Sequence, residues 1–424
     1  MNKGIISTAS YYVFFSLLTQ SLTLVSQLLL MKYFSIRDYG YMGISFEAYI
    51  FLQMIVPNAL RNFYLQKIRT SGHGNNELLL DKLVKFQIYI GSIIILTFGC
   101  IVAFLYRLDA FLSILIIATG ILSSIIQPLQ AFWLANNRRF LVIAKDLSSA
   151  FLFLLSIVVL IYYFSVSIKS IVILQFLIFS VVPCCFYIYY RLKQKGNSQT
   201  SLNIEMLNKS DIYGLLIFMM IFLVNTMHNK FGVMFLNKYT TLTEVAIYLA
   251  AFKFINPVFF VQSSLISAYM PKFIHEKELH FDYKLFLTFF IPGIIISSCL
   301  YFAFPLVVSI LSIEKYLSSY PLIKVGCLFI LVVFLYGALS NYISVSGGKN
   351  FILLTNLIAL GLMLLFCFLN RNSDNLSVFV MHVFVLAECI VGISYYLYLK
   401  FKKIKISILY ILSFSSCIIL SFFI

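Results

Sequence analysis

The sequence consists largely of apolar segments that are long enough to cross a membrane and that follow one another with only short breaks. An α-helix needs roughly 20 consecutive apolar residues to span the hydrocarbon core of a bilayer. Twelve spans are predicted, at 10–31, 41–60, 86–106, 111–134, 147–164, 170–190, 212–235, 245–268, 285–308, 321–341, 351–369 and 376–399. A further apolar run, 406–424, predicts a thirteenth helix.

The composition excludes a soluble domain, and the length of the runs excludes a β-barrel. Hydrophobic residues make up 62% of the 424 residues and charged residues only 11%, whereas soluble domains carry about 25% charged residues. Barrel strands alternate apolar and polar residues over about 10 positions, but these runs are continuously apolar. The first run lacks a small-residue cleavage site, so we expect a span there and not a signal peptide. The predicted fold class is an all-α polytopic membrane protein.

The net charge of +16 is distributed unevenly between the two sides of the membrane. With the N-terminus in the cytoplasm, 21 of the 31 Lys and Arg residues fall in inner loops, 7 in outer loops and 3 in or near spans. By the positive-inside rule, this bias places the N-terminus inside. The charge is therefore interpreted as a topology signal and as contact with anionic lipid, not as a nucleic-acid-binding surface.

The two halves of the chain resemble each other. "KYFSIRDYGYMGISFE" (32–47) aligns with "KYTTLTEVAIYLAAFK" (238–253) at an offset of 206 residues. Repeats with the same orientation predict two six-helix bundles related by an axis along the membrane normal, around a central cavity. The predicted parts are an N-terminal lobe (1–195), a cytoplasmic linker (196–211), a C-terminal lobe (212–399), and a basic loop with the extra helix (400–424).

Ionisable residues within the predicted spans are the candidate functional residues. A charge at the centre of a span costs about 2.5–3.5 kcal/mol, so it normally faces a partner or water. The repeat sets Glu47 against Lys253, at the same depth of equivalent helices. The other ionisable residues at membrane depth are Lys230, Glu388, His228 and His382.

The surroundings of the two lysines add polar groups to these charges. Asn256 shares a helix face with Lys253, and Pro257 follows at once, which would release a backbone carbonyl for water or ligand. Lys230 closes "NTMHNK" (225–230), the densest polar cluster in any span. Uncharged polar stripes on the first and fourth helices predict hydrogen bonds between helices.

Sequence signals of catalysis and of metal binding are missing. The chain has no nucleotide-binding glycine loop, no HExxH, no GxSxG and no paired carboxylates on one loop. The eight cysteines lie within apolar runs and have no metal-type spacing with histidines. We therefore expect a protein that is not an enzyme, with no catalytic residue, cofactor, metal or disulfide.

Several stretches resemble the polysaccharide flippases of the Wzx type, within the multidrug/oligosaccharidyl-lipid/polysaccharide exporter superfamily. The resemblance begins with "KYFSIRDYGYMGISFEAYIFLQMIVPNALRNFYLQKI", continues through "QAFWLANNRRFLVIAKDLSSAF" and "HNKFGVMFLNKYTTLTEVAIYLAAFKF", and includes "LSIEKYLSSYPLIKVGCLFIL". It covers nearly the whole chain through short, loose motifs. One position departs from the family pattern, because Asn229-Lys230 stands where many members carry Asp-Arg.

The resemblance implies transport of an undecaprenyl-diphosphate-linked oligosaccharide (an O-antigen or capsular repeat unit) to the outer leaflet of the bacterial inner membrane. The expected mechanism is alternating access, coupled to a proton or sodium ion. A polysaccharide polymerase and a chain-length regulator are the expected protein partners. Expected substrate contacts are Lys253, Lys230, Arg61 at the cytoplasmic mouth, Asn256 and His228; expected coupling residues or charge partners are Glu47 and Glu388.

Three other classes are weighed against this one. A multidrug exporter of the same superfamily should favour carboxylates and aromatics, which bind cationic drugs. Here the candidate residues at membrane depth include at least two lysines beside two glutamates. A membrane polysaccharide polymerase should have a large outer loop, but the predicted outer loops, such as 165–169 and 370–375, are short. A purely structural scaffold would not need costly intramembrane charges.

Overall fold

The computed structural model is helical almost throughout the part of the chain it describes, residues 3–71, 76–136, 138–164, 167–194, 207–275 and 280–423. The first half contains α1 (Lys3–Tyr33), α2 (Ile36–Ser71), α3 (Asn76–Phe86), α4 (Ser92–Leu105), α5 (Ala110–Ser124), α6 (Ile126–Ala135), α7 (Arg139–Tyr163) and α8 (Ile168–Gln194). The second half contains α9 (Lys209–Tyr239), α10 (Leu242–Ile255), α11 (Phe259–His275), α12 (Tyr283–Ile310), α13 (Tyr320–Val345), α14 (Lys349–Leu369), α15 (Leu376–Phe401) and α16 (Leu409–Ser421). The all-α prediction is confirmed.

The predicted spans correspond closely to the helices. Within the described residues, eleven helical segments are long and apolar enough to cross a membrane, and each coincides with a predicted span. The remaining prediction, 10–31, lies within α1, which has 31 residues. The largest boundary difference is at 86–106, because the structure extends that helical segment back to Glu77. Charged residues such as Asp81, which pairs with Arg191 at 2.8 Å, interrupt the apolar run but not the helix.

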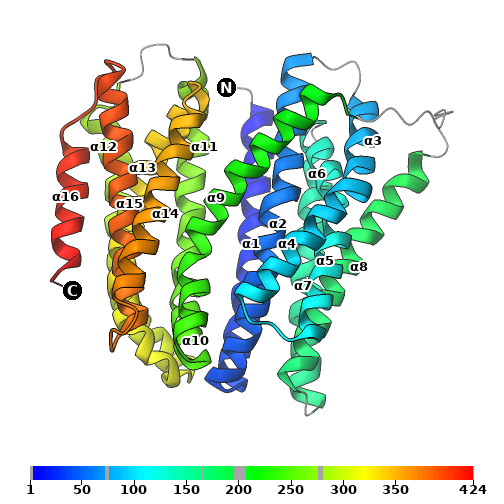
Figure 1. The fold of residues 1–424 in the computed structure, drawn as a ribbon, viewed down its shortest axis with the longest axis horizontal. Coiled ribbons are helices and arrows are strands. Elements are labelled where there is room, and N and C mark those ends of the chain that lie inside the picture. Colours follow the sequence, from blue (N-terminus) through cyan, green and yellow to red (C-terminus); the bar gives the residue numbers. More distant parts are fainter. Residues whose placement is uncertain are drawn as a thin grey trace. The chain divides into compact units, whose positions relative to one another are not determined.

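The chain divides into two compact units, Met1–Thr226 and Met227–Ile424. This division falls inside α9, whereas the sequence places a linker at 196–211, of which 196–206 lie outside the described residues. In the first unit α1 packs against α7, and α2 packs against α5 and α6. In the second unit α13 packs against α12, α15 and α11, which makes α13 its central helix (Figure 1).

The outward faces of the helices are suited to lipid. Large apolar side chains are widely exposed, among them Phe104 at 82%, Phe302 at 71% and Ile310 at 80%. An apolar surface of this extent is not stable in water, but it matches the hydrocarbon of a bilayer. The protein is therefore a multi-pass membrane protein.

The structure repeats the local geometry that the sequence alignment predicts at an offset of 206. α1 and α9 end at Tyr33 and Tyr239, and α2 and α10 begin at Ile36 and Leu242. The caps repeat as well. The backbone N–H of Asp38 donates to the Ser35 hydroxyl at 3.1 Å, and the backbone N–H of Glu244 donates to the Thr241 hydroxyl at 3.3 Å. A hydroxyl followed three residues later by an acidic residue is a helix N-cap arrangement, so both even-numbered helices start in the same way.

The predicted thirteenth helix is present as α16, but it is short. Its 13 residues extend about 20 Å at 1.5 Å per residue, less than the roughly 30 Å of a hydrocarbon core. Beyond its end, Phe423 lines a cavity together with Lys324, which lies four residues after the start of α13. The end of the chain therefore reaches the depth of the predicted outer end of α13.

We accordingly expect the C-terminus to lie outside the cytoplasm. Alkaline phosphatase fused after Ile424 should be active and β-galactosidase at the same point inactive, because α16 carries the chain from the basic "KFKKIK" loop (400–405) to the outer side. A fusion made after Lys405 is the control and should give the opposite pattern. A cytoplasmic signal from the full-length fusion would instead make 406–424 an interfacial or re-entrant segment.

Candidate functional site

The structure brings together two ionisable side chains in the second unit, His228 on α9 and Glu388 on α15. The His228 Nε2 atom lies 3.0 Å from the Glu388 Oε1 atom, and each residue is only 3% exposed. The hydroxyl of Tyr336, on α13, also lies beside the Glu388 carboxylate. A buried charge without partners would be strongly unfavourable, so these neighbours explain how a carboxylate is tolerated at this depth.

An aromatic cluster covers the His228–Glu388 pair. The ring of Phe384 lies 5.6 Å from the His228 ring, and Phe329 lies 4.8 Å from Phe384, centroid to centroid. Phe252 of α10 joins both, at 6.2 Å from Phe329 and 6.3 Å from Phe384. These rings lower the local dielectric around the pair, which strengthens every electrostatic interaction there.

The histidine retains one ring nitrogen for further chemistry. Its Nδ1 atom is buried and has no hydrogen-bond partner among the described residues. α9 approaches α10 closely just after this position, as shown by Gly232, where a Cβ would overlap the Tyr248 hydroxyl. The Nε2 atom of His228 is thus directed at a carboxylate, and its Nδ1 atom is left without a partner within the described part of the chain.

Lys253 is positioned by α10 and by the break that follows it. The residue is half-buried and stands eleven residues beyond the first residue of its helix, about 16 Å along the axis. That depth is close to the middle of a hydrocarbon core about 30 Å thick. A 3-10 turn, Asn256–Val258, interrupts the helix as the sequence predicts. Pro257 has no N–H to donate to the carbonyl of Lys253, its usual acceptor.

The other predicted residues of the second unit lie near this region of the sequence but differ in burial. Lys230 is half-buried on α9, two residues after His228, and Asn256 is exposed at the helix break. Two residues with different predicted roles form a pair in the structure. The sequence analysis assigned His228 to substrate binding and Glu388 to coupling, but the two side chains contact each other. His382, on α15 with Glu388, does not share in the pair.

The first unit holds the remaining two candidates, Glu47 and Arg61, both on α2. Glu47 is 5% exposed and stands eleven residues beyond the first residue of α2, the counterpart of the Lys253 position. Arg61 is half-buried further along α2. The pairing of Glu47 with Lys253 that the repeat suggests stays a prediction.

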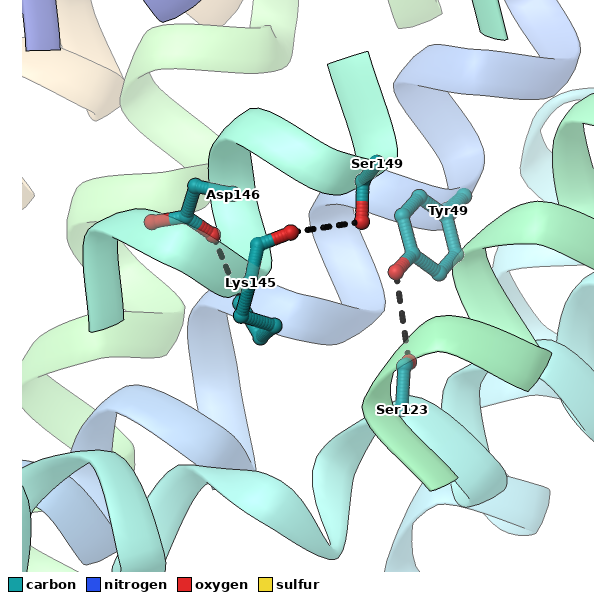
Figure 2. A network of polar contacts seen from close by, with 5 residues as sticks. All are labelled: Tyr49, Ser123, Lys145, Asp146 and Ser149. Atoms are coloured by element: carbon teal, nitrogen blue, oxygen red, sulfur yellow. Dashed lines mark hydrogen bonds and ion pairs between the residues drawn. The ribbon is translucent and has the colours of Figure 1, made fainter. Parts of the chain in front are cut away.

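Polar contacts in the first unit include hydrogen bonds between helices (Figure 2). The Tyr49 hydroxyl of α2 donates to Ser123 of α5 at 3.2 Å, and Gln53 donates to the same hydroxyl at 2.7 Å. Nearby on α7, Lys145 pairs with Asp146 at 2.7 Å. The contacts of Tyr49 and Gln53 with Ser123 are interhelical hydrogen bonds, as the polar stripe on the fourth predicted span indicates.

Among the described residues, no group of three or more His, Cys, Asp or Glu side chains is arranged to hold a metal ion. What the C-terminal unit offers is a buried acid–imidazole pair, an aromatic cluster and two half-buried lysines. Groups of this kind can bind an anion, exchange a proton or bind a cation in place of a proton.

Comparison with known proteins defines the fold class. No family model matches the chain, and no curated protein matches its sequence. Among solved structures, it is similar to the eukaryotic MATE transporter AtDTX14, with a TM-score of 0.60 and 12% identity over 98% of each chain. It is also similar to the inward-facing conformation of a multidrug resistance MATE transporter of the MOP superfamily, with a TM-score of 0.63 and 11% identity over 90% of this chain and 94% of that one.

A flippase has the same fold. The lipid II flippase MurJ, in its inward closed conformation, matches with a TM-score of 0.63 and 14% identity over 97% of this chain and 91% of that one. At identities this low, the similarity establishes the fold and leaves the substrate open. The chain thus has the fold shared by MATE transporters and by the lipid flippase MurJ.

Proposed function

We propose that the protein is a flippase of the MOP superfamily that moves an undecaprenyl-diphosphate-linked oligosaccharide across the bacterial cytoplasmic membrane by alternating access. Its N-terminus lies in the cytoplasm in this proposal, as the positive-inside rule requires. The fold supports a transporter or flippase without an enzymatic step, because MATE transporters and MurJ share it. The choice of substrate rests on the positive charge of lysines within the helices.

The observation that carries this choice is the presence of two half-buried lysines, Lys230 and Lys253, within apolar helices of the second unit. The diphosphate is the part of the substrate that hydrocarbon rejects most strongly. Fixed cations at membrane depth lower the free-energy cost of moving the diphosphate through the membrane. They do so more effectively than in water because the local dielectric is lower. The same cations would repel a cationic drug.

The remaining candidates take supporting roles. In this proposal Asn256 binds sugar hydroxyls, Arg61 attracts the substrate at the cytoplasmic mouth, and the His228–Glu388 pair couples transport to a proton or sodium ion. Glu47 is either a second coupling carboxylate or a charge partner. Interaction with a polysaccharide polymerase and a chain-length regulator remains an expectation from the family resemblance.

A multidrug exporter is the second candidate, because buried carboxylates at Glu47 and Glu388 could each bind a cation. A polysaccharide polymerase is disfavoured by the connections on the predicted outer side. α7 ends at Tyr163 and α8 begins at Ile168, and α14 ends at Leu369 and α15 begins at Leu376. Loops of this length cannot enclose a growing glycan.

The proposal is tested with purified protein in proteoliposomes. A fluorescent polyprenyl-diphosphate oligosaccharide in the inner leaflet should become accessible to a membrane-impermeant quencher when the protein is present. The control lipid is the same oligosaccharide on an uncharged glycolipid, which we expect to move at least about tenfold more slowly because it lacks the diphosphate.

A second assay separates the two candidate functions. In a drug-sensitive strain, expression of the protein should leave resistance to cationic dyes unchanged. Dye resistance without movement of the diphosphate lipid would assign the chain to the exporters instead.

A further inference from the structure

A cavity of about 430 Å³ opens between the middle of α12 and the first half of α13 in the second unit, and it shares no lining residue with the His228–Glu388 pair. One charged side chain, Lys324 of α13, lines it together with hydroxyl groups of α12 and apolar side chains. Its lining residues are Ser297, Ser298, Tyr301, Phe302, Lys324, Cys327, Leu328, Leu331 and Phe423.

We propose that this cavity binds the phosphate headgroup of an anionic membrane lipid, with Lys324 as the cation that recognises it. The inference is independent of the transported substrate, so it stands or fails separately from the proposed function. It also gives a specific role to Lys324.

The charge of Lys324 is not satisfied by an acidic side chain. None of the ion pairs formed within the described part of the chain includes this lysine, which is half-buried. Its Nζ atom lies 5.1 Å from the centroid of the Tyr320 ring, a cation–π contact that orients the ammonium group without neutralising it. A half-buried cation at a lipid-facing surface favours an anion beside it.

Lys324 lies close enough to the start of its helix for its long side chain to reach a lipid headgroup. It stands four residues beyond the first residue of α13, about 6 Å along the helix axis. The polar headgroup layer extends about 5–7 Å beyond the hydrocarbon on each side of a bilayer. The ring of Tyr320, the first residue of α13, lies 5.6 Å from the ring of Tyr301 on α12, so aromatic rings flank the start of α13 where Lys324 lies.

The cavity offers hydrogen bonds as well as charge. The Ser297 hydroxyl donates to the Cys327 carbonyl at 3.0 Å, and the Cys327 thiol donates to the Ser297 carbonyl at 3.2 Å. This reciprocal pair of hydrogen bonds joins α12 to α13 and holds two of the lining residues in place. Ser298 and Tyr301, one and four residues further along α12, add hydroxyl groups at its rim.

Its walls suit acyl chains. Phe302 is 71% exposed and Phe423 is 83% exposed, so both rings flank the opening on the lipid side. Leu328 and Leu331 form the inner wall on α13. One cation with hydroxyls at headgroup depth, continued by apolar side chains toward the hydrocarbon, is the pattern that a phospholipid requires and that a free anion does not.

The test measures lipid binding to the delipidated full-length protein by native mass spectrometry and by the lipid-induced shift in melting temperature. Phosphatidylglycerol should bind and stabilise more than phosphatidylcholine, and Lys324→Ala should weaken phosphatidylglycerol binding about tenfold, as expected for one lost charge-assisted contact. Lys315→Ala is the matched control, because Lys315 lies at the same end of the unit but does not line the cavity.

A second variant separates the cavity from charge alone. Ser298→Phe fills the opening and keeps Lys324, so it should also abolish the preference for phosphatidylglycerol. Equal binding of both lipids by the wild type, or an unchanged preference in Lys324→Ala, would overturn the proposal. Stabilisation by inorganic phosphate equal to that by phosphatidylglycerol would overturn the assignment to a lipid and leave a simple anion site.

Discussion

Replacing Lys253 by alanine is expected to abolish export of the lipid-linked oligosaccharide, whereas Lys253→Arg should retain most of it. The lysine lies near the middle of the membrane on α10, beside the break at Asn256–Val258. Loss of the proposed charge-assisted contact with the diphosphate should slow transport at least about tenfold, equivalent to about 1.5–3 kcal/mol. Arginine keeps a permanent positive charge of similar reach and should serve in its place.

The measurement is quencher accessibility of the fluorescent lipid in proteoliposomes, normalised to the amount of folded protein. Lys238→Ala is the control for the loss of one positive charge, because Lys238 is exposed at the end of α9 and should be dispensable. Normal transport by Lys253→Ala at a normal protein level would rule out the cationic role. A variant that is absent from the membrane would point to a structural role, and Lys253→Met, which keeps the length of the side chain, then distinguishes charge from packing.

The sequence predicted the helices well because each span is specified locally. An apolar run of about 20 residues has no stable alternative to a helix in lipid, whatever its neighbours are. The repeat was also visible, since the motif that caps α2 at Ser35 returns at Thr241 before α10. Pro257 marked the break in the helix that carries Lys253 for an equally local reason.

Irregularities at positions without a proline signal were not predicted, because they depend on contacts between helices. The predicted span at 86–106 contains a π-helical turn, Gln87–Gly91, and the buried amide of Gln87 donates to the Ser124 hydroxyl at 2.5 Å. Ser124 is the last residue of α5, where the predicted span at 111–134 is divided into α5 and α6. The apolar pattern of neither predicted span, 86–106 or 111–134, indicates the hydrogen bond between Gln87 and Ser124.

The pairing of His228 with Glu388 could not be predicted for the same reason. The two residues are 160 positions apart, and each lies on a different, largely apolar helix that also carries other ionisable residues. The sequence indicated that both are unusual at membrane depth, but only packing of α9 near α15 shows that they satisfy each other. The only available signal was the cost of an isolated charge, which implies a partner without identifying it.

Replacing Glu388 by glutamine is expected to uncouple transport while leaving the fold intact. Glutamine has nearly the same shape and can still accept a hydrogen bond from His228 and lie beside Tyr336. It cannot release a proton or balance a cation, so export driven by an ion gradient should fall at least about tenfold, equivalent to about 1.4 kcal/mol or more. Glu388→Ala should differ, because it leaves a buried imidazole without its partner and should destabilise the protein by about 3–5 kcal/mol.

The experiment imposes a proton or sodium gradient across the proteoliposomes and compares transport with and without it. The wild type should respond to one of the two gradients, and Glu388→Gln should respond to neither, at an unchanged melting temperature. Glu314→Gln removes an exposed carboxylate of the same unit and should behave as the wild type. If the pair acts as one device, His228→Gln and the double variant should lose no more than Glu388→Gln alone, because effects within one network are not additive. Full gradient-driven transport by Glu388→Gln would show that the carboxylate only supports the packing of α9 against its neighbours, and coupling would then have to reside at another acidic position such as Glu47.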